Sequence, residues 1–304
     1  MAFATVATLR MSYSCDSIFL DAFANRVISS KKYWVSKGDI IMAERVWERF
    51  LTEQDKATLM GRAERKIGFG ERPALLLIDL YRWVFGDKPE PVVDAIKTWP
   101  GSCGLAGWSA LPHIQKLLAK AREVEIPVIH VTGMDGVAIE PWAFRRDKTR
   151  RADMNKEQLD RVRRKFDIVD EVKPIPGETV LKKVSPSAFW GTPLIGHLNF
   201  LGVDTIITCG ESTSGCVRAS VVDGTTNRLR MVVAEECVFD RHEACHAINL
   251  FDMNQKYADV LPLDEILKYL DAWRAEKAGQ VGYANDSVAY LKDLVIGEDF
   301  KGLR

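Results

Sequence analysis

The sequence predicts an α/β fold, an open parallel sheet with helices on both faces and a helical extension before it. Short runs that are apolar throughout recur along the chain, helical patterns fill the gaps between them, and turn residues separate the two. Such runs are typical of strands buried on both faces, and strand–helix alternation predicts right-handed βαβ units. The expected strands are residues 74–79, 127–131, 205–209 and 231–234, with a shorter candidate at 179–181.

The helices are expected from apolar residues at helical spacing. Asp39 is placed to cap a helix that reaches Phe50, and Thr52 begins a second helix that runs to about Lys66. Two long loops, 86–108 and 133–178, interrupt the alternation, and loops of this length are usually functional or cover something. The helices expected between and after the strands are 109–123, 193–201, 216–227, 242–254 and 264–275.

Three segments follow from this pattern: an N-terminal helical extension (1–70), an α/β domain (71–275) and a C-terminal extension (276–304). Trp47 and Phe50 in the first segment form an apolar face that must be covered, either by the chain's own domain or by a neighbouring subunit.

Composition excludes several classes of protein. Lys plus Arg number 42 and Asp plus Glu number 42 among 304 residues, so the formal net charge is zero, which argues against nucleic-acid binding. No apolar run is long enough to span a membrane. Six unevenly spaced cysteines favour a reducing compartment, and we expect the cytoplasm. Residues 1–15 loosely resemble a transit peptide, although a frayed start is the plainer interpretation.

Three chemically active side chains are expected where the strands end, the edge at which open α/β sheets bind ligands. Asp79 ends the first strand, Lys183 follows the strand at 179–181, and Cys216 begins a helix after a Gly-Ser-rich turn. A helix start and a nearby ammonium favour a thiolate, and a carboxylate can take the thiol proton. Each residue also has a plainer interpretation: a loop-capping Asp, a surface Lys beside Lys182, and a small buried Cys.

Three sequence blocks decide between these interpretations: 72–80, 183–194 and 209–220, the last reading CGESTSGCVRAS. In order and spacing they resemble the isochorismatase-like cysteine hydrolases, which include nicotinamidases, N-carbamoylsarcosine amidases and maleamate amidases. The third block is most similar to the N-carbamoylsarcosine amidase branch. The resemblance implies a Rossmann-like three-layer sandwich, a homo-oligomer (dimer or tetramer), and no cofactor.

The resemblance also implies a mechanism. It makes Asp79, Lys183 and Cys216 a catalytic triad that cleaves the C–N bond of a small amide or N-carbamoyl substrate through a thioester, releasing ammonia. It implies a cis peptide between Glu211 and Ser212, with the N–H groups of Ser212 and Cys216 forming the oxyanion hole. Alternatives are a lactam or other non-peptide hydrolase with the same triad, and a binding or redox protein that uses Cys216.

Aromatic residues next to these blocks are candidates for substrate binding. Phe85, Phe189 and Trp190 are the choices, with local packing as the alternative for each. No metal is expected, because the loop after Asp79 contains no His and His130 stands alone. Residues 242–246 read HEACH, which fits a zinc-binding pattern with Glu265 as a third ligand, but a five-residue match arises often by chance.

Overall fold

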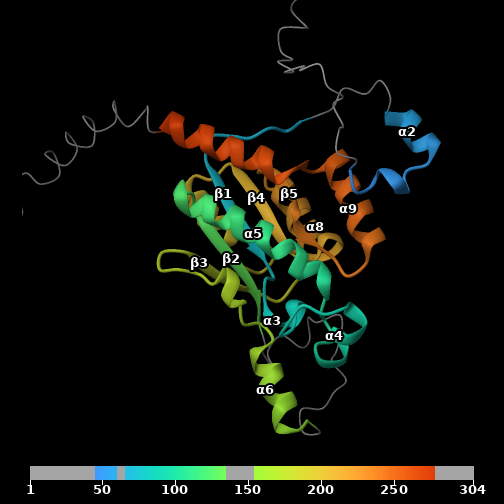
Figure 1. Cartoon of the computed structure of the whole chain (residues 1–304). Coiled ribbons are helices and arrows are strands. Elements are labelled where there is room, and N and C mark those ends of the chain that lie inside the picture. Colours follow the sequence, from blue (N-terminus) through green and yellow to red (C-terminus); the bar gives the residue numbers. More distant parts are fainter. Residues whose placement is uncertain (1–44, 60–65, 135–153, 278–304) are drawn as a thin grey trace, which may run out of the picture. The chain divides into compact units, whose positions relative to one another are not determined.

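The centre of the protein is a six-stranded parallel sheet in the order β3-β2-β1-β4-β5-β6 (Figure 1). The computed structural model describes residues 45–59, 66–134 and 154–277. The predicted fold class is confirmed, and the strand order reverses direction between β1 and β4, where open sheets form a crevice. The strands are β1 (Pro73–Ile78), β2 (Val128–Gly133), β3 (Thr179–Lys183), β4 (Thr205–Glu211), β5 (Arg230–Phe239) and β6 (Asp259–Leu261).

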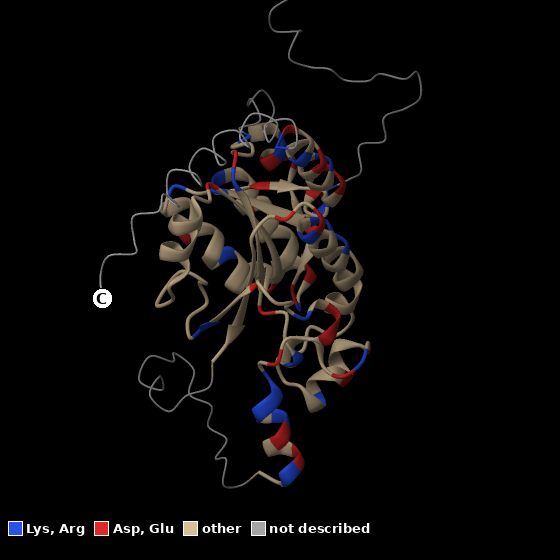
Figure 2. Cartoon of the chain, turned by 90° about the vertical axis from the view of Figure 1, so that its left-hand side faces the viewer, with Lys and Arg blue, Asp and Glu red and all other residues tan. Residues whose placement is uncertain are grey.

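Helices cover both faces of the sheet, as the apolar strands require. Every residue of β1 is buried, because Leu75 and Leu77 face one apolar core while Leu76 and Ile78 face the other. In Figure 2 the sheet is almost entirely uncharged, and the charged segments gather on helices and at strand ends. One core contains α5 (Leu105–Glu123) and the helical residues 263–277; the other contains α7 (Leu194–Leu201), α8 (Arg218–Thr226) and α9 (Glu243–Lys256).

The end of β4 lies unusually close to β1. Gly210 pairs with Ile78, and a Cβ at this glycine would lie 2.0 Å from the Ile78 carbonyl oxygen. Its φ of +119° is also a conformation that side chains disfavour. Glycine therefore lets the two central strands approach at the point where the candidate site begins.

Several boundaries differ from the sequence prediction. The loop expected at 86–108 contains α4 (Val92–Thr98), and α5 begins at Leu105 rather than Ser109. The loop expected at 133–178 contains α6 (Lys156–Arg164), which an Asn155 capping box begins. Strand β6 was not expected, and β5 continues to Phe239 rather than ending at Ala234. The smaller helical elements are α2 (Glu53–Leu59), α3 (Arg82–Phe85), η1 (Glu48–Phe50) and η4 (Asp170–Val172).

The described part of the N-terminal extension packs on its own chain. Of the helix expected over 39–50, residues 45–50 contain only the 3₁₀ turn η1. Trp47 is 6% exposed and its ring lies 6.3 Å from that of Phe251 in α9. Arg45 donates to the Val260 carbonyl at 2.7 Å. The first of the two expected ways to cover Trp47 is therefore the one observed. Residues 1–44, 60–65, 135–153 and 278–304 lie outside the described residues.

Candidate active site

Strands β1 and β3 and the turn after β4 bring the expected reactive side chains together beyond the ends of the strands. Asp79 directly follows β1 and has a φ of +56°, a left-handed conformation that Asp tolerates better than most residues. Lys183 is the last residue of β3. Cys216 lies in η5 (Thr213–Val217), a π-helical turn between β4 and α8, where a helix starting at Cys216 was expected. The chain segments that carry these residues are far apart in sequence.

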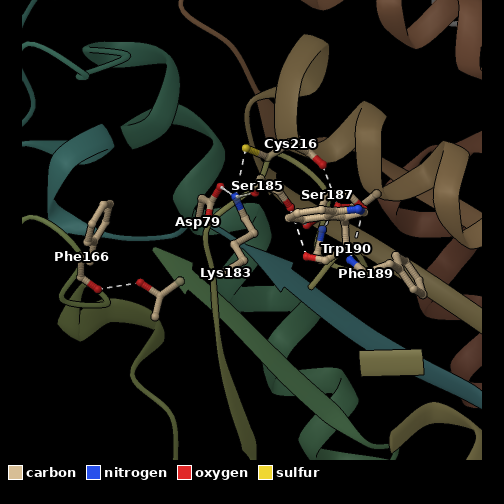
Figure 3. A network of polar contacts seen from close by, with 11 residues as sticks. Asp79, Phe166, Lys183, Ser185, Ser187, Phe189, Trp190 and Cys216 are labelled. Carbon is tan, nitrogen blue, oxygen red and sulfur yellow. Dashed lines mark hydrogen bonds and ion pairs between the residues drawn. The ribbon is translucent and has the colours of Figure 1, made fainter. Parts of the chain in front are cut away.

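The Lys183 ammonium is the centre of this group (Figure 3). Its Nζ lies 2.7 Å from Asp79 Oδ2 and donates to Cys216 Sγ at 3.2 Å. It also donates to the Ser185 carbonyl oxygen at 3.1 Å. Asp79 has no exposed surface and Lys183 is 7% exposed, whereas Cys216 is half-buried. Lys182, in contrast, is exposed and lines a cavity beside the ends of β2 and β3.

Burial makes Asp79 a stronger base than an ordinary carboxylate. Burial raises the pKa of Asp79, and the charge and hydrogen bond of Lys183, with a hydrogen bond from Cys216, offset this only in part. Burial acts in the opposite sense on Lys183, but the charges of Asp79 and Cys216 leave the pKa of Lys183 above its usual value. Lys183 therefore stays protonated, and the Asp79 carboxylate beside it is able to accept a proton from another group.

The surroundings of Cys216 favour the thiol over the thiolate. Burial and then the negative charge of Asp79 raise the pKa of the Cys216 thiol, and Lys183 lowers it by less. The sequence-based expectation that a helix start and an ammonium favour the thiolate omits both raising effects. A thiolate in this site therefore depends on transfer of the proton to a neighbouring base.

The turn that carries Cys216 is held by short backbone contacts. The peptide bond between Glu211 and Ser212 is cis, as the resemblance implies. Gly215 N–H donates to the Ser212 carbonyl at 2.9 Å, and Val217 N–H donates to the same oxygen at 3.1 Å. Ser220 Oγ donates to the Cys216 carbonyl at 2.7 Å and accepts from Ala188 N–H at 2.9 Å, which joins this turn to the 183–194 block.

The three candidate substrate-binding aromatics have different surroundings. Phe85 has no exposed surface, and its ring packs against Trp108 and Phe239 at 5.7 and 5.3 Å. Phe189 is 7% exposed and belongs to the opposite core. Trp190 is 54% exposed, and Figure 3 places it on the Ser185–Ser187 side of the triad. Their contact with substrate stays a prediction, which exposure favours for Trp190 over the two phenylalanines.

Two of the three histidines considered as metal ligands, His130 and His246, have other side-chain partners. His130 Nε2 lies 2.8 Å from Glu178 Oε2, and Arg122 Nε donates to Glu178 Oε1 at 2.7 Å. His246 Nδ1 lies 2.8 Å from Thr213 Oγ1. Within the ranges that the structure describes, no three His, Cys, Asp or Glu side chains are grouped to hold a metal ion.

Two features of the site were not expected from the sequence. Glu211 accepts from the Cys103 thiol at 3.7 Å, and burial, with the charges of Asp79 and Asp240, raises the pKa of Glu211 to about 8. Asp240 accepts from the N–H and the hydroxyl of Ser214. The available signal for Asp240 was a polar residue directly after an apolar Cys237–Phe239 run, but that run was not recognised as a strand end.

The sequence matches a known protein family over the part of the chain that carries this site. The Isochorismatase domain model matches residues 73–265. The chain belongs to the isochorismatase family. The match begins at β1 and includes the elements that carry Asp79, Lys183 and Cys216, so it covers the whole site.

Among curated isochorismatase-family relatives, maleamate amidohydrolase from Pseudomonas putida is 35% identical over 210 residues, 68% of this chain and 90% of that protein. N-carbamoylsarcosine amidase from Arthrobacter is 31% identical over 225 residues, 69% of this chain and 75% of that protein.

Solved structures show the same fold. An isochorismatase family protein from Desulfovibrio vulgaris has a TM-score of 0.53 and 26% identity, covering 66% of this chain and all of that one. A cysteine hydrolase from Pseudomonas syringae has a TM-score of 0.56 and 17% identity, covering 70% of this chain and all of that one.

Proposed function

We propose that this protein is a cysteine amidohydrolase that cleaves the C–N bond of a small amide or N-carbamoyl substrate through a thioester and releases ammonia. One observation carries the proposal: a single buried ammonium, Lys183, contacts both the Asp79 carboxylate and the Cys216 sulfur. The names of the two curated relatives, a maleamate amidohydrolase and an N-carbamoylsarcosine amidase, support C–N hydrolysis.

The first half-reaction forms the thioester. Asp79 takes the Cys216 proton as the sulfur attacks the substrate carbonyl carbon, and Lys183 stabilises the charges of both groups. The tetrahedral oxyanion accepts hydrogen bonds from the N–H groups of Ser212 and Cys216. Asp79 then gives its proton to the departing nitrogen as the C–N bond breaks, and ammonia leaves.

The second half-reaction restores the thiol. Asp79 takes a proton from water, the hydroxide attacks the thioester carbonyl, and the C–S bond breaks with return of the proton to sulfur. The raised pKa of Asp79 suits both directions of transfer, because a catalytic acid–base group works best with a pKa near the pH of the reaction.

The remaining expectations accompany this function. Residues 71–275 form the hydrolase domain between two extensions, and the protein works as a homo-oligomer in the cytoplasm. The five cysteines of the described residues are all free, which supports a reducing compartment. No helix among the described residues has the length and hydropathy needed to cross a bilayer.

Ammonia release from a panel of amides tests the function. The panel contains maleamate, N-carbamoylsarcosine, nicotinamide, biuret and ureidoacrylate, each assayed with the wild type and with Cys216→Ala. We expect release from at least one compound and none above background in the variant. Release that persists in Cys216→Ala would overturn the mechanism, and no release from any compound by the wild type would count against the substrate class.

A further inference from the structure

The turn that carries Cys216 is held from outside by one segment of the chain, residues 240–246, which follows β5 and enters α9. Asp240 Oδ2 accepts from the Ser214 N–H at 2.9 Å and from the Ser214 hydroxyl at 2.6 Å. His246, one helical turn into α9, shares a 2.8 Å hydrogen bond with the hydroxyl of Thr213. Two consecutive residues of the turn are therefore each held by a separate side chain of this segment.

The same segment is fixed at its other side, so it is able to act as a rigid support. Arg241 Nε donates to the Ser102 carbonyl at 3.1 Å, and an Arg241 terminal nitrogen donates to the Pro100 carbonyl at 2.9 Å. Asp240 and Arg241 thus tie the turn to the loop before α5, across the ends of β4 and β5.

The positions of Thr213 and Ser214 in the turn indicate what their hydrogen bonds to His246 and Asp240 do. Thr213 and Ser214 lie between Ser212 and Cys216, whose N–H groups are the proposed oxyanion donors. A hydrogen-bond donor stabilises an oxyanion only when it is already aimed at the developing charge, and a displacement of about 1 Å costs about 100-fold in rate. Thr213 has no exposed surface, so its hydroxyl is held inside the protein by His246.

We propose that Asp240 and His246 are positioning residues that hold the 212–217 turn so that its backbone N–H groups meet the oxyanion. The proposal rests on the proposed function, and it gives a role to His246, the second of the two histidines in the HEACH sequence that a zinc site would use. Neither residue donates or accepts a proton in the reaction. Both act through the backbone of the turn.

Two chemical reactions of the same sulfur test this proposal without a natural substrate. Acylation by p-nitrophenyl acetate passes through a tetrahedral oxyanion: the S–C bond forms, p-nitrophenolate leaves, and Asp79 keeps the thiol proton. Alkylation by iodoacetamide displaces iodide at a saturated carbon and forms no oxyanion. The ratio of the two rate constants at Cys216 therefore reports on the oxyanion donors, with mass spectrometry to place each adduct and Cys216→Ala as the blank.

The variants are Asp240→Ala and His246→Ala, with Asp252→Ala as the matched control. Asp252 is also a partly buried carboxylate, but it pairs with Arg218 and Lys256 and has no hydrogen bond to the turn. We expect acylation to fall about 10- to 100-fold in Asp240→Ala and by a smaller factor in His246→Ala, with alkylation within about 2-fold of the wild type. Asp240→Asn, which keeps an acceptor oxygen, should retain more acylation than Asp240→Ala.

The ratio of the acylation and alkylation rate constants tests the positioning role of Asp240 and His246 independently of the hydrolase function. An unchanged ratio in both alanine variants would overturn it, and so would equal losses of acylation and alkylation, because these indicate general damage to Cys216. The amide panel decides the hydrolase function by itself, since the ratio is measured with an activated ester. Where an amide is hydrolysed, the same variants should lose kcat with KM little changed.

Discussion

Replacing Glu211 by Gln should stabilise the protein in alkaline solution and leave it nearly unchanged in mild acid. Burial, with the charges of Asp79 and Asp240, raises the pKa of the Glu211 carboxyl from 4.5 to about 8. A carboxyl with a raised pKa in the folded protein contributes stability that is fully present below about pH 4.5 and is lost as the pH rises through about 8. Glutamine stays neutral throughout.

The size of the effect follows from the same values. The difference between 4.5 and about 8, at about 1.4 kcal/mol for each pKa unit, corresponds to about 5 kcal/mol of unfolding free energy. Glu211 is partly exposed, and solvent screening reduces the expected effect to about 3 kcal/mol. Its sole hydrogen-bond donor among the described side chains is the Cys103 thiol, a weak donor that an amide oxygen accepts equally well.

Urea unfolding at about pH 5 and about pH 9.5 measures this difference. The free energy of unfolding of Glu211→Gln should exceed that of the wild type by about 3 kcal/mol at the higher pH and by less than about 1 kcal/mol at the lower. Glu171→Gln, at an exposed position, is the control and should show little change at either pH. An equal wild-type-to-variant difference at the two pH values would refute the reasoning, because it would mean that folding does not raise the pKa of the Glu211 carboxyl.

Three further predictions concern stability. Burial raises the pKa of Glu178, but hydrogen bonds from Arg122, the Ile175 N–H and His130 outweigh it and lower the pKa to about 2. The ionised Glu178 therefore contributes about 3 kcal/mol to the free energy of unfolding. This contribution is present above about pH 4.5 and is lost as the pH falls toward 2. Acid titration of unfolding should therefore be shallower in Glu178→Gln, and parallel curves would contradict this. Gly210→Ala should lower stability by more than about 3 kcal/mol in urea unfolding, since its Cβ meets the Ile78 carbonyl; a loss below about 1 kcal/mol would contradict the close approach. Trp47→Ala should cost about 3 to 5 kcal/mol, and a change as small as that of an exposed residue would mean that Trp47 does not dock on α9.

The sequence predicted the apolar parts of the strands and missed the parts that carry charge. Strand β1 is six buried residues with no polar side chain, so its pattern is unambiguous. Strand β5 contains Glu235 and Glu236, which end an apolar run when only neighbours in sequence are considered. Glu235 pairs with Arg45 at 3.0 Å, and Glu236 accepts from the Leu263 N–H at 2.7 Å. Both partners are distant in sequence, so the strand is recognisable only after folding.

The same limit applies to the site. Asp79 and Cys216 were identified because each stands at the boundary of a regular element. Lys183 was separated from Lys182 by resemblance to a family pattern, and the structure gives the physical difference: one lysine is 7% exposed beside Asp79 and the other faces solvent. Asp240 was missed because the end of its strand was misplaced.

The sequence by itself determined the fold class, the order of the strands along the chain and the three reactive residue types. These follow from local patterns, since burial on both faces requires an apolar run and a turn requires small or polar residues. Only the tertiary structure decided the pKa shifts of the site residues and the side chains that hold the Cys216 turn. A pKa depends on burial and on charges that are neighbours in space, and the contacts of Glu211, Asp240 and His246 join segments that the sequence keeps apart.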